Sequence, residues 1–320
     1  MHILVIGGTG FLGRGFAEDA VALGHEVTVV DRRPPRAWRL AERIKIHVAD
    51  VTRREELAEV FSLTEPDAVV YLAAFGTGGA GLLTSAQADP DAAVRVNVGG
   101  LLLTMQLCRQ HRIRKLVWTS STTVLGQAGM YPTEAVDESA LVGPASVYGA
   151  TKVLGEQLSA ALAAEYGMQI NALRPTMVWG PGVQYRGIQS GLCDLVPHAV
   201  RGEAVSVAAP AEAWDLIYIR DVSGALLTLV ELDTAAPVVQ VSGYRASVAD
   251  VAEGVRKRFP TARIEVRPEP ARLGIPFVDT TLATKLGIRP RFDLARSIND
   301  YAATVSGAER APVTGERGGI

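Results

Sequence analysis

Short apolar runs alternate with longer stretches of mixed polarity through the first half of the chain. The runs are four to six residues long, as buried strands are, and the stretches between them have the length and spacing of helices. The predicted strands are 3–6, 26–30, 45–49, 69–74, 115–119 and 169–173, and the clearest helices are 11–23 and 147–166. This alternation predicts an α/β protein with a doubly wound parallel sheet, the Rossmann arrangement.

The regular alternation ends near residue 177. Prolines at positions 181, 197, 210, 237 and 260 divide the rest of the chain into short elements. We therefore predict a dinucleotide-binding domain over 1–176 and a smaller C-terminal substrate lobe over 177–305. A strand and an apolar helix within 214–232 have the character of core elements, so the chain is expected to return to the main sheet there. The tail 306–320 is polar and without periodicity, and is predicted to be mobile.

A glycine-rich segment, Gly7-Gly8-Thr9-Gly10-Phe11-Leu12-Gly13, joins the first strand to the first helix. In this spacing Gly7 makes the tight turn, Gly10 lets the backbone approach a pyrophosphate, and Gly13 lets the helix pack on the strand. The amino end of the helix then faces the phosphates. The segment predicts a bound dinucleotide, and a glycine turn without a ligand is the alternative.

The second strand ends at Asp31, about the expected distance beyond the glycine segment for a carboxylate that accepts hydrogen bonds from ribose hydroxyls. This residue favours NAD. Arg32 and Arg33 follow directly, and an arginine there can instead bind the 2'-phosphate of NADP, or simply lie in solvent. NAD is the predicted cofactor, with NADP as the alternative.

Tyr148 and Lys152 lie four residues apart in the predicted helix 147–166 and therefore on the same face of it. A phenol titrates near ~10, so proton exchange at neutral pH requires its pKa to fall by roughly 3, equivalent to about 4 kcal/mol. Two unit charges about 4 Å apart at an effective dielectric of 20 interact by about that amount. The pair therefore predicts an acid/base tyrosine beside an ammonium group, although the same spacing also occurs on solvated helices.

Together, the glycine segment and the Tyr148-Gly149-Ala150-Thr151-Lys152 segment make the chain resemble an extended short-chain dehydrogenase/reductase, the group that includes NAD-dependent sugar epimerases and dehydratases. Further matches in the same order are Asp50-Val51, Leu72-Ala73-Ala74, Asn97, Thr119-Ser120-Ser121, Arg174-Pro175, Gly180-Pro181-Gly182 and Tyr218-Ile219-Arg220-Asp221-Val222. The resemblance covers nearly the whole chain.

The resemblance implies a role for each matching residue. Tyr148 exchanges the proton, Lys152 lowers the pKa of the tyrosine and holds the nicotinamide ribose, and Ser121, five residues before Gly126, hydrogen-bonds the reacting oxygen. The implied cofactor-binding residues are Gly7, Gly10, Phe11, Leu12, Gly13, Asp31, Arg32, Asp50, Val51, Leu72, Ala73, Ala74, Asn97, Thr119, Tyr148, Lys152 and Pro175. No metal site is predicted.

The chain also departs from this group. Sugar dehydratases carry an Asp-Glu pair directly after the catalytic threonine, where this chain has Thr122 and Thr123, so dehydration is not expected. Nucleotide-sugar epimerases have an asparagine and an arginine for the sugar diphosphate where this chain has Met177 and Trp214. These departures favour an NAD(P)-dependent oxidoreductase over the alternative, a sugar epimerase that retains NAD. A non-catalytic dinucleotide sensor is a third hypothesis, but such relatives lose the tyrosine or the lysine.

Composition restricts the partners. With 320 residues, a net charge of -2 and no basic patch, the chain does not have the character of a nucleic-acid-binding protein. Two cysteines are too few for a disulfide framework, and no apolar stretch is long enough to span a membrane, so we expect a cytoplasmic enzyme acting on a small molecule. Cys193 is interpreted as a small buried hydrophobic residue rather than a nucleophile.

Helices 147–166 and 92–109 are apolar around much of their circumference. One face of each covers the sheet, and the remainder needs another partner. Relatives of this type pair these helices with their symmetry mates, so a homodimer is expected, with the chain's own loops as the alternative cover.

Overall fold

A seven-stranded parallel sheet forms the centre of the larger domain in the computed structural model, which describes residues 1–33, 43–76, 79–183, 187, 190–270 and 274–307. Its strand order is β11-β7-β5-β4-β1-β2-β3. The strands are β1 (His2–Ile6), β2 (Glu26–Asp31), β3 (Lys45–Val48), β4 (Ala68–Tyr71), β5 (Lys115–Thr119), β7 (Gln169–Pro175) and β11 (Val238–Val241). The order reverses between β1 and β4, which is where doubly wound sheets bind their ligands.

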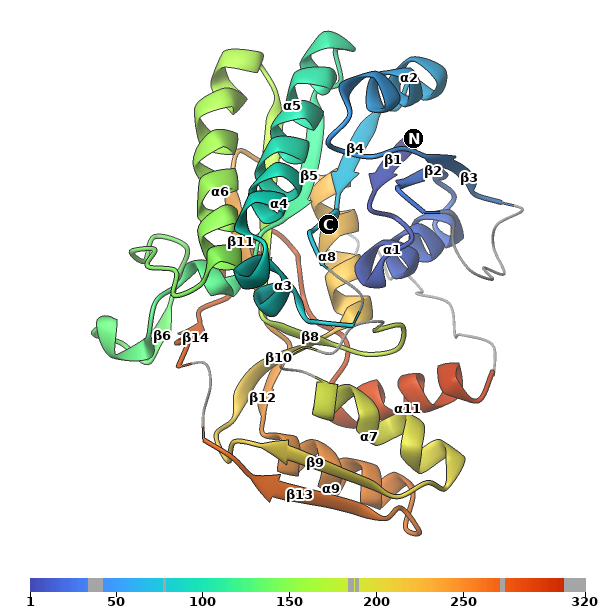
Figure 1. The fold of residues 1–320 in the computed structure, drawn as a ribbon, viewed down its shortest axis with the longest axis vertical. Helices are drawn as coiled ribbons and strands as arrows, with labels where there is room; N and C mark the ends of the chain where they lie inside the picture. Colours follow the sequence, from blue (N-terminus) through green and yellow to red (C-terminus); the bar gives the residue numbers. More distant parts are fainter. Residues whose placement is uncertain (34–42, 77–78, 184–186, 188–189, 271–273, 308–320) are drawn as a thin grey trace.

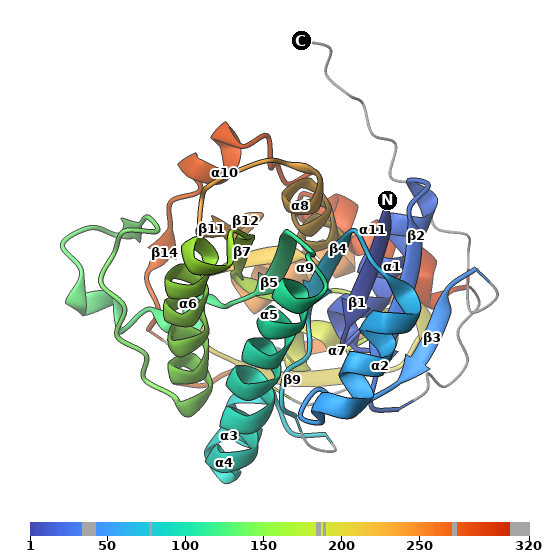
Figure 2. The same cartoon turned by 90° about the horizontal axis from the view of Figure 1, so that it is seen from above.

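Helices cover both faces of this sheet (Figures 1 and 2). One face is covered by α1 (Phe11–Ala22) and α8 (Ile219–Glu231), and the other by α2 (Arg54–Thr64), α5 (Leu101–Gln110) and α6 (Val147–Tyr166). α3 (Leu82–Ala88), α4 (Pro90–Val94) and a π-helical turn (Arg95–Gly100) lead into α5. α5 and α6 lie side by side in both views.

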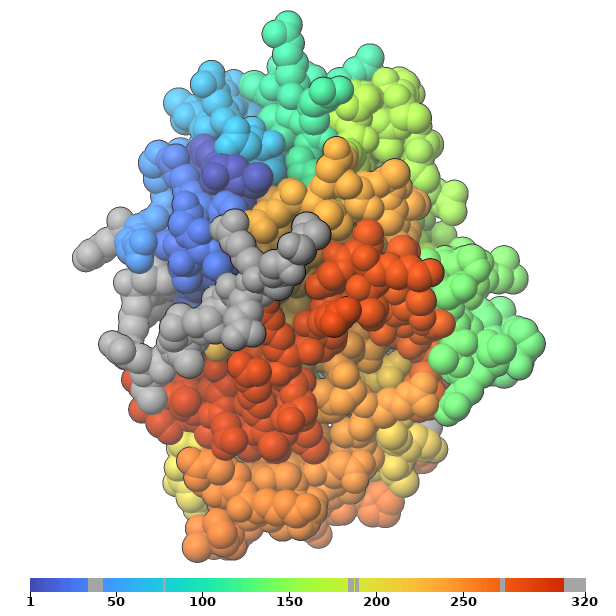
Figure 3. Space-filling model, turned by 180° about the vertical axis from the view of Figure 1, so that it is seen from behind, coloured from blue at the N-terminus to red at the C-terminus, as the bar shows by residue number. Residues whose placement is uncertain are grey.

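A second lobe lies below the sheet in Figure 1 and has its own core around Trp179, Leu216 and Tyr218. It contains the strands β8 (Met177–Trp179), β9 (Val205–Ala209), β10 (Trp214–Tyr218), β12 (Tyr244–Ala246) and β13 (Ile264–Pro268), and the helices α7 (Ser190–Arg201), α9 (Val248–Arg258) and α11 (Leu294–Val305). Seen from behind, orange and red segments from the C-terminal part of the chain form most of the lower surface (Figure 3).

Short elements connect the two parts. β6 (Ala135–Val136) and β14 (Phe277–Val278) pair with each other, and α10 (Thr281–Lys285) packs near β11. Two 3-10 turns, Thr122–Val124 and Ala128–Met130, follow β5. The first of these turns contacts α6 and carries part of the candidate site.

The six strands predicted from the apolar runs all belong to the main sheet, which confirms the doubly wound fold. The predicted return to this sheet near 214–232 is wrong for the strand: β10 joins β8 and β12 in the lobe, and the returning strand is β11. The returning helix is α8, which packs on the sheet as expected. β4 ends at Tyr71, three residues earlier than predicted, and the predicted mobile tail lies outside the described residues from 308 onward.

Candidate active site

The glycine segment between β1 and α1 is held so tightly that side chains do not fit at two of its positions. Gly7 has a φ of +81°, and a Cβ built on it lies 2.5 Å from the backbone nitrogen of Ala73. A Cβ on Gly13 lies 2.4 Å from the carbonyl oxygen of Gly7. Among the described residues, that same oxygen, at 3.2 Å, is the one atom within 4 Å of a Cβ on Gly10. Backbone atoms therefore fill the space next to Gly7 and Gly13, whereas the space next to Gly10 is almost free of protein atoms.

Asp31 at the end of β2 borders this segment. Its carboxylate accepts a hydrogen bond from the backbone N–H of Thr9 at 3.2 Å, which ties the strand end to the glycine turn. Nearby, Asp50 accepts from the backbone N–H and the hydroxyl of Thr52. Although burial by itself would raise the pKa of Asp50, these hydrogen bonds and the positive charges of Arg32 and Arg53 hold that pKa below its usual value. Asp31 and Asp50, both predicted to bind the cofactor, thus lie at adjoining strand ends.

Tyr148 and Lys152 lie near the start of α6, whose first turn is capped by Ser146 through a hydrogen bond from the N–H of Gly149. Both side chains are buried, and the Lys152 ammonium lies 5.4 Å from the centre of the Tyr148 ring. The ammonium therefore lies beside the ring of the tyrosine, and the catalytic roles of the two residues stay predictions. Lys152 Nζ donates to the carbonyl oxygen of Thr119 at 2.7 Å. Burial lowers the pKa of Lys152 to about 8, and the carboxylate of Glu156 opposes that effect.

Ser121 follows β5 and caps the first 3-10 turn. Its hydroxyl oxygen accepts from the backbone N–H of Thr123 at 3.2 Å and shares a hydrogen bond with the Thr123 hydroxyl at 2.9 Å. The turn fits closely against α6, because a Cβ on Gly149 would lie 2.3 Å from the carbonyl oxygen of Thr123 and 2.9 Å from Pro144 Cβ. Gly149 therefore sets how closely the serine turn approaches the helix that carries Tyr148.

Replacing Gly149 by alanine should push α6 away from the serine turn. The clash is with backbone, so we expect a loss of about 1–3 kcal/mol in the free energy of unfolding and a lower turnover rate. Gly224→Ala is the matched control, because Gly224 lies inside α8 with no described atom within 4 Å of a built Cβ. That variant should be neutral or more stable by up to about 1 kcal/mol. Equal stability of the two variants in urea denaturation would contradict the assigned role of Gly149.

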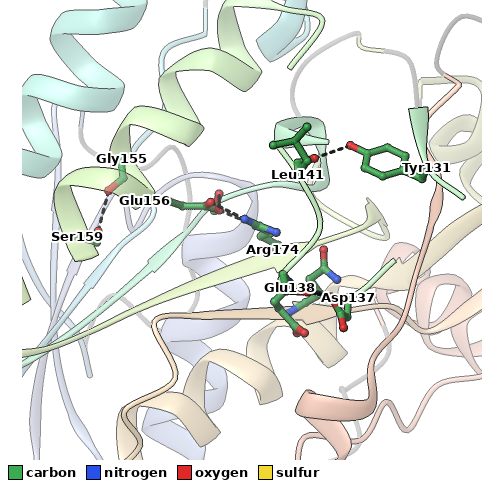
Figure 4. Close-up of polar contacts among 11 residues, drawn as sticks. Tyr131, Asp137, Glu138, Leu141, Gly155, Glu156, Ser159 and Arg174 are labelled. Atoms are coloured by element: carbon green, nitrogen blue, oxygen red, sulfur yellow. Dashed lines mark hydrogen bonds and ion pairs between the residues drawn. The ribbon is translucent and has the colours of Figure 1, made fainter. Parts of the chain in front are cut away.

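A buried ion pair that the sequence pattern did not predict lies one helical turn beyond Lys152. Arg174 Nε and Nη2 donate to the two carboxylate oxygens of Glu156 at 2.7 and 2.6 Å, and the Ser120 hydroxyl donates to the same carboxylate at 2.5 Å. Figure 4 shows Glu156 and Arg174 pointing toward each other, with Asp137 and Glu138 on a neighbouring loop. The pair ties α6 to β7 and to the residue before Ser121.

The remaining predicted residues lie around the same strand ends. Leu72, Ala73 and Ala74 form the loop after β4, Thr119 and Pro175 end β5 and β7, and Phe11 and Leu12 begin α1 and contact the lobe core. Val51 packs in the core beneath Gly100.

Asn97 is buried, accepts from the N–H of Phe75 at 2.7 Å and donates to the Thr151 hydroxyl at 3.0 Å. Its amide therefore holds the β4 loop against α6, and its contact with a cofactor stays a prediction.

A doubly wound sheet with a glycine turn after β1, a tyrosine and a lysine near the start of α6, and a serine turn packed against that helix is the arrangement of an extended short-chain dehydrogenase/reductase. The chain belongs to the NAD-dependent epimerase/dehydratase family, whose model matches residues 3–241.

Similar proteins agree with this assignment. An uncharacterized epimerase/dehydratase of Staphylococcus saprophyticus is 23% identical over 97% of this chain and 99% of its own length. The structure of a Thermus thermophilus UDP-glucose 4-epimerase in complex with NAD is 25% identical, with a TM-score of 0.82 over 97% of this chain and 100% of that one. An L-threonine dehydrogenase from Clostridium difficile shares the fold at 20% identity, with a TM-score of 0.83 over 96% and 98% of the two chains. The chain is thus an NAD-dependent enzyme of the short-chain dehydrogenase/reductase type.

Met177 and Trp214, which replace the polar residues expected of nucleotide-sugar epimerases, both pack against the lobe core. Cys193 is buried in that core, which confirms the prediction that it is a packing residue.

No helix in the described ranges is long and apolar enough to cross a bilayer. Among the same residues, no cluster of three or more His, Cys, Asp or Glu side chains is arranged to hold a metal ion.

Proposed function

We propose that the protein is an NAD-dependent oxidoreductase that exchanges hydride with a hydroxyl or carbonyl group of a small molecule, with Tyr148 as the acid/base. The observation that carries this proposal is the Lys152 ammonium, buried beside the Tyr148 ring and bonded to the carbonyl of Thr119, two residues before Ser121. A dinucleotide sensor has no need of this arrangement.

The glycine segment fits a dinucleotide. Gly7 and Gly13 allow the tight inner turn and Gly10 leaves the outer side open, where the amino end of α1 supplies backbone N–H groups with no side-chain cap. Asp31 would accept from the ribose hydroxyls, and Lys152 would hold the nicotinamide ribose. When bound, the nicotinamide supplies the group that takes up or returns hydride.

Each of the three catalytic side chains has a separate task. Tyr148 gives or takes the proton of the reacting oxygen, because its ring is held at the start of α6 near the serine turn. Lys152 stabilises the phenolate by its charge, and its protonated state falls off as the pH rises through about 8. Ser121 hydrogen-bonds the reacting oxygen and so orients the substrate.

The alternative is an epimerase that keeps NAD bound and returns the hydride to the same substrate. Met177 and Trp214, which pack against the lobe core, favour the dehydrogenase, because neither offers the amide or guanidinium group with which such epimerases bind a sugar diphosphate. The two solved relatives suggest the probes, L-threonine for a dehydrogenase and UDP-glucose for an epimerase. We expect the purified protein to carry NAD well below one equivalent and to reduce added NAD with a hydroxyl substrate such as L-threonine. Stoichiometric NAD with conversion of UDP-glucose to UDP-galactose would establish the epimerase instead.

NAD should bind more tightly than NADP. The Asp31 carboxylate accepts from ribose hydroxyls but repels a 2'-phosphate, and it is anchored by Thr9 at the edge of the glycine turn. Titration of each cofactor by protein fluorescence measures the preference, and Asp31→Ser should reduce it. A tenfold preference of the wild type for NADP would show that Arg32 and Arg33 dominate.

A homodimer through α5 and α6 is expected. Fewer apolar residues of these helices are exposed for such a contact than the sequence suggested. Leu154 on α6 and Val94 on α4 are 45% and 46% exposed, whereas Leu101, Met105 and Leu107 of the apolar helix are fully buried in the core of the single chain. Leu154→Asp should therefore convert a dimer into monomers in sedimentation at low micromolar concentration. Leu23→Asp is the control, because Leu23 is 43% exposed at the end of α1, which covers the opposite face of the sheet. A wild-type protein that sediments as a single chain would exclude the dimer.

We also expect the enzyme to work in the reducing cytoplasm, because its two cysteines are buried and form no disulfide with each other.

A further inference from the structure

The hydroxyl oxygen of Ser121 is committed to a neighbour in its own turn. The backbone N–H of Thr123 donates to it at 3.2 Å, and the Thr123 hydroxyl oxygen lies 2.9 Å from it, within hydrogen-bond distance. A serine hydroxyl has two acceptor lone pairs and one proton. When the Thr123 hydroxyl donates as well as the Thr123 N–H, both lone pairs of Ser121 are engaged and only its proton is left to offer.

We propose that Thr123 is a positioning residue that makes Ser121 a dedicated hydrogen-bond donor toward the oxygen of the substrate. This inference rests on the proposed function, in which Ser121 contacts the reacting oxygen. A serine free to rotate would divide its time between donating and accepting. A serine held as a donor always presents its proton to the oxygen on which negative charge develops.

The structure fixes Thr123 well enough for this task. Its carbonyl oxygen lies directly against Gly149, so the serine turn is held by the same helix that carries Tyr148. The next residue, Val124, is fully buried. A β-branched side chain also has few χ1 states, which keeps the Thr123 hydroxyl near Ser121. An uncharged hydroxyl at this position cannot carry out the acid/base work of the dehydratase carboxylates, but it can direct a neighbouring proton.

Neighbouring Thr122 provides a matched control. Its hydroxyl donates to the carbonyl oxygen of Pro175 at 3.4 Å, so it shares the turn and the chemistry of Thr123 without contacting Ser121. Valine at either position removes one hydroxyl and keeps the side-chain shape. A difference between the two valine variants therefore reports the contact with Ser121.

Neutron diffraction from deuterated crystals of the NAD complex tests the proton arrangement without any substrate. The expected result places the Thr123 hydroxyl deuterium on the line to Ser121 Oγ and the Ser121 deuterium pointing away from Thr123. A Ser121 deuterium directed at the Thr123 oxygen would overturn the proposal, because Ser121 would then be the donor within the turn and could only accept from a ligand.

Kinetics with the probe substrate that the enzyme turns over, for example L-threonine with NAD, tests the consequence. Thr123→Val should lower kcat about tenfold with a smaller change in KM, since each factor of ten in rate corresponds to about 1.4 kcal/mol, the size of one hydrogen bond. Thr123→Ser should restore most of the rate, and Thr122→Val should leave it within about twofold. In a Ser121→Ala background Thr123→Val should have no further effect, and a further tenfold loss there would contradict action through Ser121.

The two proposals fail in different ways. Full activity of a Tyr148→Phe variant would overturn the proposed function while leaving the neutron result in place. A normal loss of activity in Tyr148→Phe together with no effect of Thr123→Val would overturn only the role of Thr123.

Discussion

Replacing Tyr148 by phenylalanine should lower the turnover rate by about 10²–10⁴ while leaving NAD affinity nearly unchanged. The ring packs with Phe75, Ala86, Ala92 and Ala93, so phenylalanine keeps these apolar contacts and loses only the phenolic hydroxyl. NAD affinity is measured by fluorescence titration. Turnover is measured from the absorbance of NADH with a hydroxyl substrate that the wild type oxidises, for example L-threonine. A large loss of turnover rate with an unchanged NAD affinity would identify the Tyr148 hydroxyl as the proton-transfer group.

Tyr166→Phe on the same helix is the control for this change. Tyr166 ends α6, where its ring lies 4.6 Å from the Arg109 guanidinium, and it lies away from the serine turn. The control should keep the wild-type rate. If Tyr148→Phe retains more than a few per cent of the wild-type rate, another group exchanges the proton and the assignment of Tyr148 is wrong.

The catalytic helix could be predicted from the sequence to the residue, because local signals mark both of its ends. Ser146 caps the start by accepting from the N–H of Gly149, and Gly167 ends the helix in the left-handed region at a φ of 61°. Once these ends are fixed, the spacing of Tyr148 and Lys152 places both on one face. Six of the seven strands of the main sheet could also be predicted, to within three residues at their ends, because strands covered on both sides consist of continuous apolar residues.

The lobe was less predictable because its strands are short and their partners are distant in sequence. β8 and β12 have three residues each, too few to show a period, and β10 resembles a core strand whether it joins the main sheet or the lobe. β11 follows Pro237 with only four residues and lies at the edge of the main sheet. Which sheet receives a short apolar strand depends on tertiary pairing, which local pattern does not specify.

The ion pair between Glu156 and Arg174 illustrates the same limit at the site. The two residues are 18 positions apart, on a helix and on a strand, and nothing in the spacing connects them. One signal was present: Arg174 is a charged residue in a strand that is otherwise buried, and a buried guanidinium requires a partner. Glu156, one turn after Lys152, was the nearest acidic residue on the face of α6 that covers this strand.

Breaking this pair should cost far more stability than its hydrogen bonds alone suggest. The side chains of Arg174 and Glu156 are 3% and 6% exposed, so Glu156→Gln leaves a buried guanidinium without its hydrogen-bonded counter-charge and with only the more distant charge of Glu138. We expect a loss of about 3–5 kcal/mol in the free energy of unfolding, measured by urea denaturation with tryptophan fluorescence. Since Glu156 opposes the effect of burial on Lys152, the pKa of Lys152 should also fall below about 8 in this variant.

The same helix supplies the control. Glu165 near the end of α6 pairs with Arg109 at 3.6 Å, but these side chains are 62% and 56% exposed. Glu165→Gln should therefore change stability by no more than about 0.5–1 kcal/mol. A double variant, Glu156→Leu with Arg174→Met, removes both buried charges and should recover most of the stability lost in Glu156→Gln. If Glu156→Gln is as stable as Glu165→Gln, water reaches the Arg174 guanidinium, and the attachment of α6 to β7 must rest on apolar packing instead.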